Sequence, residues 1–193
     1  MPDINIDTSQ VPPVKLHDPR FRILLNDMRS RLADPKERKA ICIHEVTHAM
    51  YLTKAGKRNL KVTGPQIAYD AKSDTFDRTG AAIKGGYVDQ QYLAQVSVVE
   101  WITATAKAYA APAVAVAVLA NRPGVDNGDT GDRQGFEEFF KKVRTKHPDI
   151  RIDLDSLWRK ARESVRADLE KPGLRETILK TAEELEAWLF PRN

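Results

Sequence analysis

The sequence contains few of the residues that most often bind transition metals. In 193 residues there is one cysteine, Cys42, and there are four histidines. A single cysteine excludes a disulfide within the chain and a zinc site built from several thiolates. Any metal site in this chain therefore has to use histidine, aspartate or glutamate. We expect Cys42 itself to pack in the core.

Long apolar runs are also missing. No uninterrupted run reaches the roughly 20 residues that a bilayer span requires, and the longest apolar stretch, residues 108–120, contains Pro112. We interpret it as a buried helix and expect no membrane span. The first residues lack a basic start followed by an apolar segment, so the predicted location is the cytoplasm. With 41% apolar and 30% charged residues, the chain fits one soluble domain over residues 1–193.

No strong excess of one charge sign is present either. The formal net charge is +4, and basic residues alternate with acidic ones, as in WRKARESVRADLEK (residues 158–171). Such mixing is typical of a solvated helix face. Because no cluster of aromatic and basic residues is visible, we expect no nucleic-acid partner. A DNA- or RNA-binding protein is kept only as the weakest alternative.

Apolar spacing predicts a mainly helical chain with a small sheet. Residues 1–19 are interpreted as an extended arm, residues 34–146 as the core that carries the candidate site, and residues 150–193 as C-terminal helices. We expect residues 71–80 to connect strands and Pro112 to break or kink its helix. Helices are predicted at residues 21–32, 35–55, 90–120, 133–147, 153–170 and 174–189, and two or three strands within residues 60–64, 66–70 and 81–88.

One motif carries chemistry: His44-Glu45-Val46-Thr47-His48, an H-E-x-x-H pattern on the second predicted helix. Each helical residue advances about 100°, so His44 and His48 project from one face and can place two imidazole nitrogens on one zinc ion. Glu45 lies to the side, outside the ligand set. From there its carboxylate can act as general base on a water molecule.

The alternative is that the two histidines contact only polar neighbours or solvent. Apolar residues surround the motif on most sides of the helix, which predicts burial. A buried glutamate beside two buried histidines is costly without a partner, and a divalent cation supplies one. We therefore predict Zn2+ at His44 and His48, and interpret His17 and His147 as surface residues.

A zinc hydrolase site needs a third protein ligand and one open position. The local extensions of the motif do not provide it, since neither a third histidine nor a glutamate stands at the required spacing. Two candidates remain. Asp132 ends the loop sequence NGDTGD, and Glu100 is a lone carboxylate in an apolar helix. Asp132, like Asp129, can also be a helix N-cap, and Glu100 can belong to an exposed stripe.

Four segments resemble the peptidase domain of FtsH-type zinc proteases. These are ERKAICIHEVTHA (residues 37–49), the strand region from KVTGPQIAYD to GGYV (61–88), AAPAVAVAVLA (110–120) and GDTGD (128–132). The resemblance implies a helical zincin-like bundle, mainly α (α+β), with a small two- or three-stranded sheet after the HExxH helix. It also implies that Asp132 is the third zinc ligand, and that copies of the chain assemble with one another.

The resemblance implies a zinc-dependent peptidase with Glu45 as general base, acting on peptides or unfolded protein. Substrate backbone is expected along the strand edge at Gly85, Gly86, Tyr87 and Val88, where strand addition would place it. Two departures support an alternative, a catalytically silent interaction module with a peptidase fold. Thr47 stands where the family has glycine, and the chain has no ATPase module.

Overall fold

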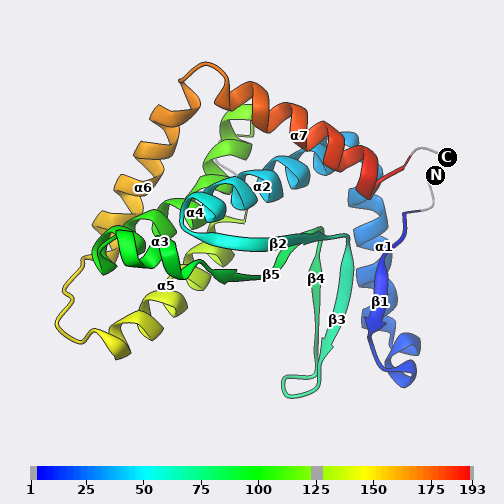
Figure 1. The fold of residues 1–193 in the computed structure, drawn as a ribbon. Helices are drawn as coiled ribbons and strands as arrows, with labels where there is room; N and C mark the ends of the chain where they lie inside the picture. Colours follow the sequence, from blue (N-terminus) through cyan, green and yellow to red (C-terminus); the bar gives the residue numbers. More distant parts are fainter. Residues whose placement is uncertain (1–3, 123–127, 192–193) are drawn as a thin grey trace.

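A computed structural model describes residues 4–122 and 128–191. The described residues form seven α-helices, one short 3-10 helix and five strands, which confirms the predicted mainly α fold with a small amount of sheet. In Figure 1, helix α7 runs above helix α2, and the strands lie below it. The α-helices are α1 (Pro19–Ala33), α2 (Pro35–Lys54), α3 (Gln90–Gln95), α4 (Val98–Leu119), α5 (Asp129–Lys146), α6 (Leu154–Leu169) and α7 (Leu174–Leu189).

Helix α2 carries the H-E-x-x-H motif, as predicted. The side chain of Asp34 accepts a hydrogen bond from the backbone N–H of Lys36, and Pro35 occupies the first helical position. The helix ends before Gly56, whose φ of 86° belongs to the left-handed region that glycine adopts easily. Local sequence signals thus fix both ends of the helix that presents the two histidines.

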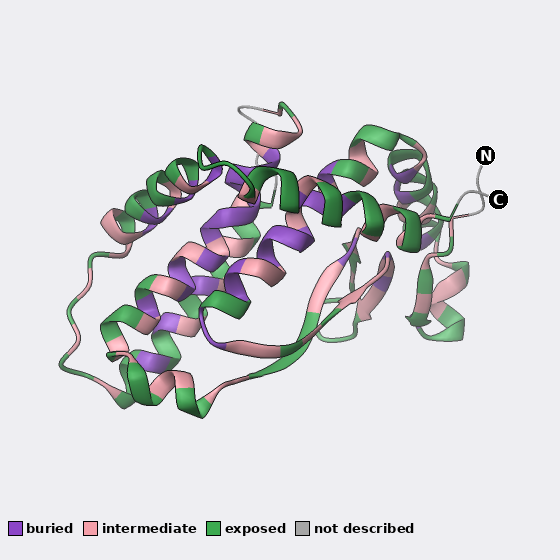
Figure 2. Ribbon diagram, turned by 45° about the horizontal axis from the view of Figure 1, so that its top comes forward, coloured by how far each residue is buried: buried purple, intermediate pink, exposed green. Residues whose placement is uncertain are grey.

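Helix α4 packs along α2 and forms the other half of the core. Ser97 and Glu100 close a capping box at its start. The helix runs on through Pro112, so of the break or kink expected there the break is absent, and the separation within residues 90–120 lies instead between α3 and α4. In Figure 2 the buried residues concentrate on the central helices, whereas the outer helices carry exposed faces.

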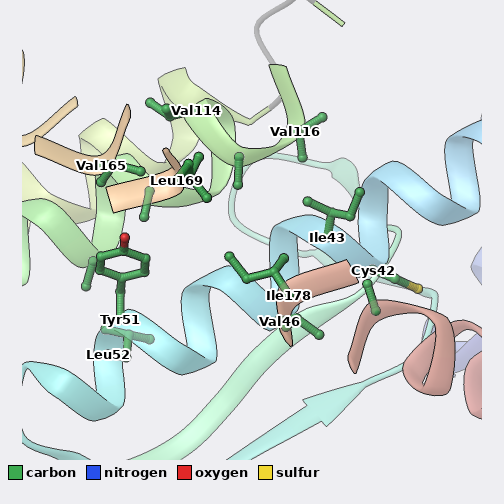
Figure 3. Close-up of a cluster of buried hydrophobic side chains, with 14 of the residues drawn as sticks. Cys42, Ile43, Val46, Tyr51, Leu52, Val114, Val116, Val165, Leu169 and Ile178 are labelled. Carbon is green, nitrogen blue, oxygen red and sulfur yellow. The ribbon is translucent and has the colours of Figure 1, made fainter. Parts of the chain in front are cut away.

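The largest buried cluster lies between α2, α4, α6 and α7, and Figure 3 shows ten of its side chains with labels. Ile43 and Ile178 are fully buried there, and so is Cys42, as expected. By length and composition α4 is the one helix in the described ranges that could cross a membrane, but 61% of its most apolar window is buried inside the fold. Core helices pass the same test, so this is weak evidence for a membrane span.

The strands form two small sheets. Strands β1 (Asp7–Gln10), β3 (Gln66–Asp70) and β4 (Thr75–Thr79) make one sheet, with β1 parallel and β4 antiparallel to β3. Strands β2 (Lys57–Thr63) and β5 (Ala82–Val88) make an antiparallel pair. The expectation that residues 71–80 only connect strands was wrong, because residues 75–79 pair with β3. The N-terminal arm is held by this sheet, and Val11, directly after β1, is buried.

Polar contacts join α2 to the helices around it. The Tyr51 hydroxyl donates to Asp168 on α6 at 3.0 Å, and Lys107 on α4 lies 2.6 Å from the same carboxylate. At the other end of α2, Arg38 donates to the carbonyl oxygens of Leu32 and Ala33 at the end of α1. The helix that presents the motif is thereby held at both ends.

Candidate metal centre

His44 and His48 lie one turn apart on α2 and face the start of α5. Their ring centroids are 5.0 Å apart, and the rings meet edge to face. The His48 side chain is 11% exposed and that of His44 17%, so both imidazoles lie at the floor of the site rather than on the open surface. This arrangement follows from the helical spacing of the motif.

Asp132 on α5 completes the cluster. Its Oδ1 lies 2.8 Å from Nε2 of His48, and its Oδ2 lies 3.5 Å from Nε2 of His44. Among the described residues, the structure groups these three side chains as a candidate metal site, with ligand atoms all within 4.8 Å of one another. The three residues predicted as zinc ligands are therefore brought together, although Asp132 comes from a distant part of the chain.

The first turn of α5 turns Asp132 toward the histidines. The N-cap is Gly128, which has a φ of 87° and offers no side chain, so neither Asp129 nor Asp132 is the N-cap. A Cβ atom at Gly128 would lie 2.7 Å from Cε1 of His44, too close for any larger residue. Gly131, the second glycine of the GDTGD sequence, has no positive φ. Arg162 on α6 pairs with Asp129 and anchors this turn from outside.

Glu45 lies beside the cluster and is 6% exposed. Burial raises the pKa of Glu45 to about 7, the His48 imidazole lowers it, the Asp132 carboxylate raises it, and the backbone N–H of Ile83 on β5 lowers it. The Glu45 carboxyl group therefore lies between its own helix, α2, and strand β5.

The donor set suits a zinc ion. Two ligand atoms about 2.1 Å from zinc in tetrahedral geometry are about 3.4 Å apart. Nε2 of His44 lies 3.5 Å from Oδ2 of Asp132, and Nε2 of His48 lies 2.8 Å from the other oxygen, Oδ1, so a small shift of the side chains would bring one carboxylate oxygen to this distance from both imidazole nitrogens. Oδ2 of Asp132 and Nδ1 of His48 are buried without a hydrogen-bond partner among the described residues. A buried carboxylate oxygen in that state is a ready metal ligand.

The other candidates lie elsewhere. Glu100 is exposed and its carboxylate accepts the backbone N–H of Ser97 at 2.7 Å, so it caps α4 and is absent from the histidine cluster. His17 is exposed and His147 is half-buried at the end of α5, away from the cluster. On β5, Gly85, Gly86 and Tyr87 are exposed and Val88 is half-buried, and the role of these residues in binding substrate backbone remains a prediction.

Thr47 does not obstruct the site. Its side chain is fully buried, and its hydroxyl donates to the carbonyl oxygen of Ile43 at 2.6 Å on the same helix. The hydroxyl is therefore satisfied within α2. The residue that departs from the FtsH-type pattern neither blocks the cluster nor adds a ligand to it.

A pocket of about 230 Å³ opens beside His44 and Glu45. Sequence reasoning missed most of its walls, because they come from α1, the β4–β5 turn and the end of α4. The motif alone could indicate only the α2 side. The lining residues are Met28, Arg31, Leu32, Glu37, Ala40, Ile41, His44, Glu45, Arg78, Gly80, Ala81, Val116, Arg122 and Gly128.

Comparisons with protein-family models, with curated proteins and with solved structures give no match for this chain. Its family is therefore not shown, and the resemblance to FtsH-type peptidases stays a prediction.

Proposed function

We propose that this protein is a zinc-dependent peptidase. The observation that supports the proposal is the convergence of His44, His48 and Asp132 beside the buried carboxyl group of Glu45. Two imidazoles and one carboxylate leave one tetrahedral position open, which is the ligand pattern of hydrolytic zinc sites. A structural zinc site would instead use four protein ligands.

Each residue has a separate task in this proposal. His44, His48 and Asp132 would hold the ion, which when bound lowers the pKa of water and polarises the carbonyl of the scissile bond. Glu45 accepts the proton of the attacking water and returns it to the leaving amine. The Ile83 N–H keeps the Glu45 carboxylate oriented during both transfers. One water molecule is consumed for each peptide bond cleaved.

Peptides fit this site better than folded proteins. The pocket beside Glu45 holds about 230 Å³, room for a few small residues. A folded partner cannot insert backbone into so small a space, so the chain acts on extended peptides or unfolded segments.

The test compares the wild-type protein with Glu45→Gln and His44→Ala. Wild-type protein and Glu45→Gln should bind zinc equally, whereas turnover of a quenched-fluorescence peptide pool should fall about 100- to 10,000-fold in Glu45→Gln. His44→Ala should lose both zinc and turnover. Zinc is measured by elemental analysis after dialysis, and His17→Ala is the matched control because His17 is exposed. Equal, substoichiometric zinc in the wild type and His44→Ala would sink the proposal, and zinc binding without turnover would favour the interaction module.

A further inference from the structure

The pocket beside Glu45 continues along α2 toward the start of that helix. At one end it is lined by His44 and Glu45, and at the other by Glu37. Glu37 precedes Glu45 by eight residues, which corresponds to roughly 12 Å of helix rise. The pocket therefore links the candidate metal centre to a distant group of side chains in the first turn of α2.

That distant end is rich in arginine. Arg31 on α1 lies 3.2 Å from one Glu37 oxygen, and Arg122 beyond α4 lies 2.9 Å from the other. Arg78 on β4 also lines the pocket and pairs with Asp27. Two guanidinium groups thus already contact one carboxylate there, and together with Arg78 the three arginines carry one more charge than their two acidic partners, Glu37 and Asp27. Arginine is the side chain best suited to bind carboxylates, because its planar donors match the two oxygens.

The stretch between the two ends is apolar. Its lining residues are Leu32, Ile41, Ala81 and Val116. Gly80 lets the turn between β4 and β5 pack closely on α2, since a Cβ at Gly80 would lie 2.7 Å from Ile41. The volume of about 230 Å³ admits extended chain with small side chains and excludes a run of bulky ones. A ligand for this pocket therefore has an uncharged stem and an anionic end.

We propose that the pocket binds the C-terminal end of a peptide, with the free α-carboxylate at Arg31 and Arg122 and the scissile bond at the metal centre. The cleavage step rests on the proposed peptidase function. An extended chain gains about 3.3 Å per residue, so roughly 12 Å corresponds to about three residues after the scissile bond. The side-chain carboxylate of a residue next to that bond is too short to reach the arginines. Water adds across the bond, leaving a new carboxylate on the longer fragment and an amine on the released short peptide.

Glu37 affects both the position of the two arginines and their availability to a ligand. Its carboxylate holds the two arginines in position and also competes with an incoming carboxylate for their donors. Removing its charge should therefore strengthen binding of a peptide C-terminus, whereas removing either arginine should weaken it. A purely structural cluster predicts no such opposite effects on ligand binding.

The experiment uses three pools of random nonapeptides that differ only at the C-terminal end. One pool carries a free carboxylate, the second a C-terminal amide, and the third an amide with glutamate fixed at the third position from the end. Mass spectrometry of products from the zinc-loaded wild type should show release of about two to four C-terminal residues from the first pool. Initial rates on the amide pool should be about 10- to 100-fold lower, the range for a charged hydrogen bond. Cleavage positions unrelated to the C-terminus, at equal rates in both pools, would overturn the inference and leave the peptidase proposal intact.

If the third pool is cleaved as fast as the first, the arginines bind an internal glutamate side chain as well as they bind a C-terminal carboxylate. That result would contradict the inference. Binding gives a readout independent of turnover, measured as fluorescence anisotropy of labelled pools on Glu45→Gln protein. On this background Arg31→Gln and Arg122→Gln should remove the preference for the free-acid pool, whereas Glu37→Gln should increase it. Arg133→Gln is the control and should leave the preference unchanged, because Arg133 on α5 pairs with Glu137 and does not line the pocket. If the wild type cleaves no pool yet this preference is present, the peptidase proposal fails and the carboxylate site stands. If the preference is absent, the site is refuted.

Discussion

Nε2 of His48 lies 2.8 Å from Oδ1 of Asp132, although 84 residues separate the two in the sequence. The contact joins the middle of α2 to the first turn of α5. Of the two carboxylates considered from the sequence, Asp132 is therefore the one beside the motif, whereas Glu100 caps α4.

Asp132→Ala should weaken zinc binding by more than 100-fold. Removing a direct ligand costs more than the 10- to 100-fold typical of partners that only orient a ligand. Glu100→Ala should leave zinc affinity unchanged, because Glu100 caps α4. Competition with a chelator of known affinity measures both. A collapse of affinity in Glu100→Ala alone would remove Asp132 from the ligand set.

Zinc should raise the unfolding midpoint of the wild-type protein. A ligand that binds only the folded state stabilises it by RT ln(1 + [L]/Kd), about 2.7 kcal/mol at a concentration 100 times Kd. The increase should vanish in His48→Ala and persist in His17→Ala, since His17 is exposed and lies outside the cluster. Differential scanning fluorimetry with and without chelator gives the comparison, and an unchanged shift in His48→Ala would contradict it.

Gly128→Ala should damage both stability and metal binding. Alanine at a φ of 87° costs about 1–2 kcal/mol, and its Cβ would press on the His44 ring. Gly131→Ala is the matched control, because no atom lies within 4 Å of its Cβ position and its φ is not positive. In the helix α5 this control should be neutral or stabilising by up to about 1 kcal/mol. Chemical denaturation and zinc titration of both variants would show the contrast, and equal effects would refute the role of Gly128.

Asp168 should make the stability of the fold depend on pH in the acid range. Burial alone raises the pKa of Asp168, but hydrogen bonds from Lys107 and Lys171 outweigh it and lower the pKa to about 2. Because the folded pKa lies below the ordinary value near 3.9, the stabilisation is full above about pH 5 and is lost as the pH falls through 2.

Asp168→Asn should therefore lower the free energy of unfolding by about 2 kcal/mol at pH 6 and by much less near pH 2. Urea denaturation at several pH values measures the difference. Asp149→Asn, on the exposed turn after α5, is the control and should show little change at any pH. A constant loss across the whole range would mean that the carboxylate charge is not what stabilises the contact.

Local signals in the sequence determined most of the helices. Asp34 and Pro35 mark the start of α2, and the predicted limits of the last helix agree with Leu174–Leu189. The placement of His44 and His48 on one face was equally local, because it follows from helical geometry alone. Caps and spacing act between residues a few positions apart, so they can be recognised without knowing the fold.

Strand β4 shows where local signals failed. Its sequence TFDRT is mostly polar, and its burial pattern is largely exposed. It becomes a strand because Gln66 to Asp70 offer a partner edge, and that pairing is a property of the hairpin rather than of the segment. Helix α4 likewise passes Pro112 because tertiary packing on α2 and α6 outweighs the local cost of proline.

The sequence by itself determined the two histidines, the glutamate between them and the helix that presents them. It left the third ligand as a choice between Asp132 and Glu100, since a carboxylate 84 residues away can be brought close only by folding. The tertiary structure brings Asp132 beside the two histidines by packing α5 against α4, and it alone gathers Arg31, Arg78 and Arg122 around one pocket from three separate segments. Contacts between residues far apart in the chain depend on which apolar faces pack together, and no local pattern encodes that.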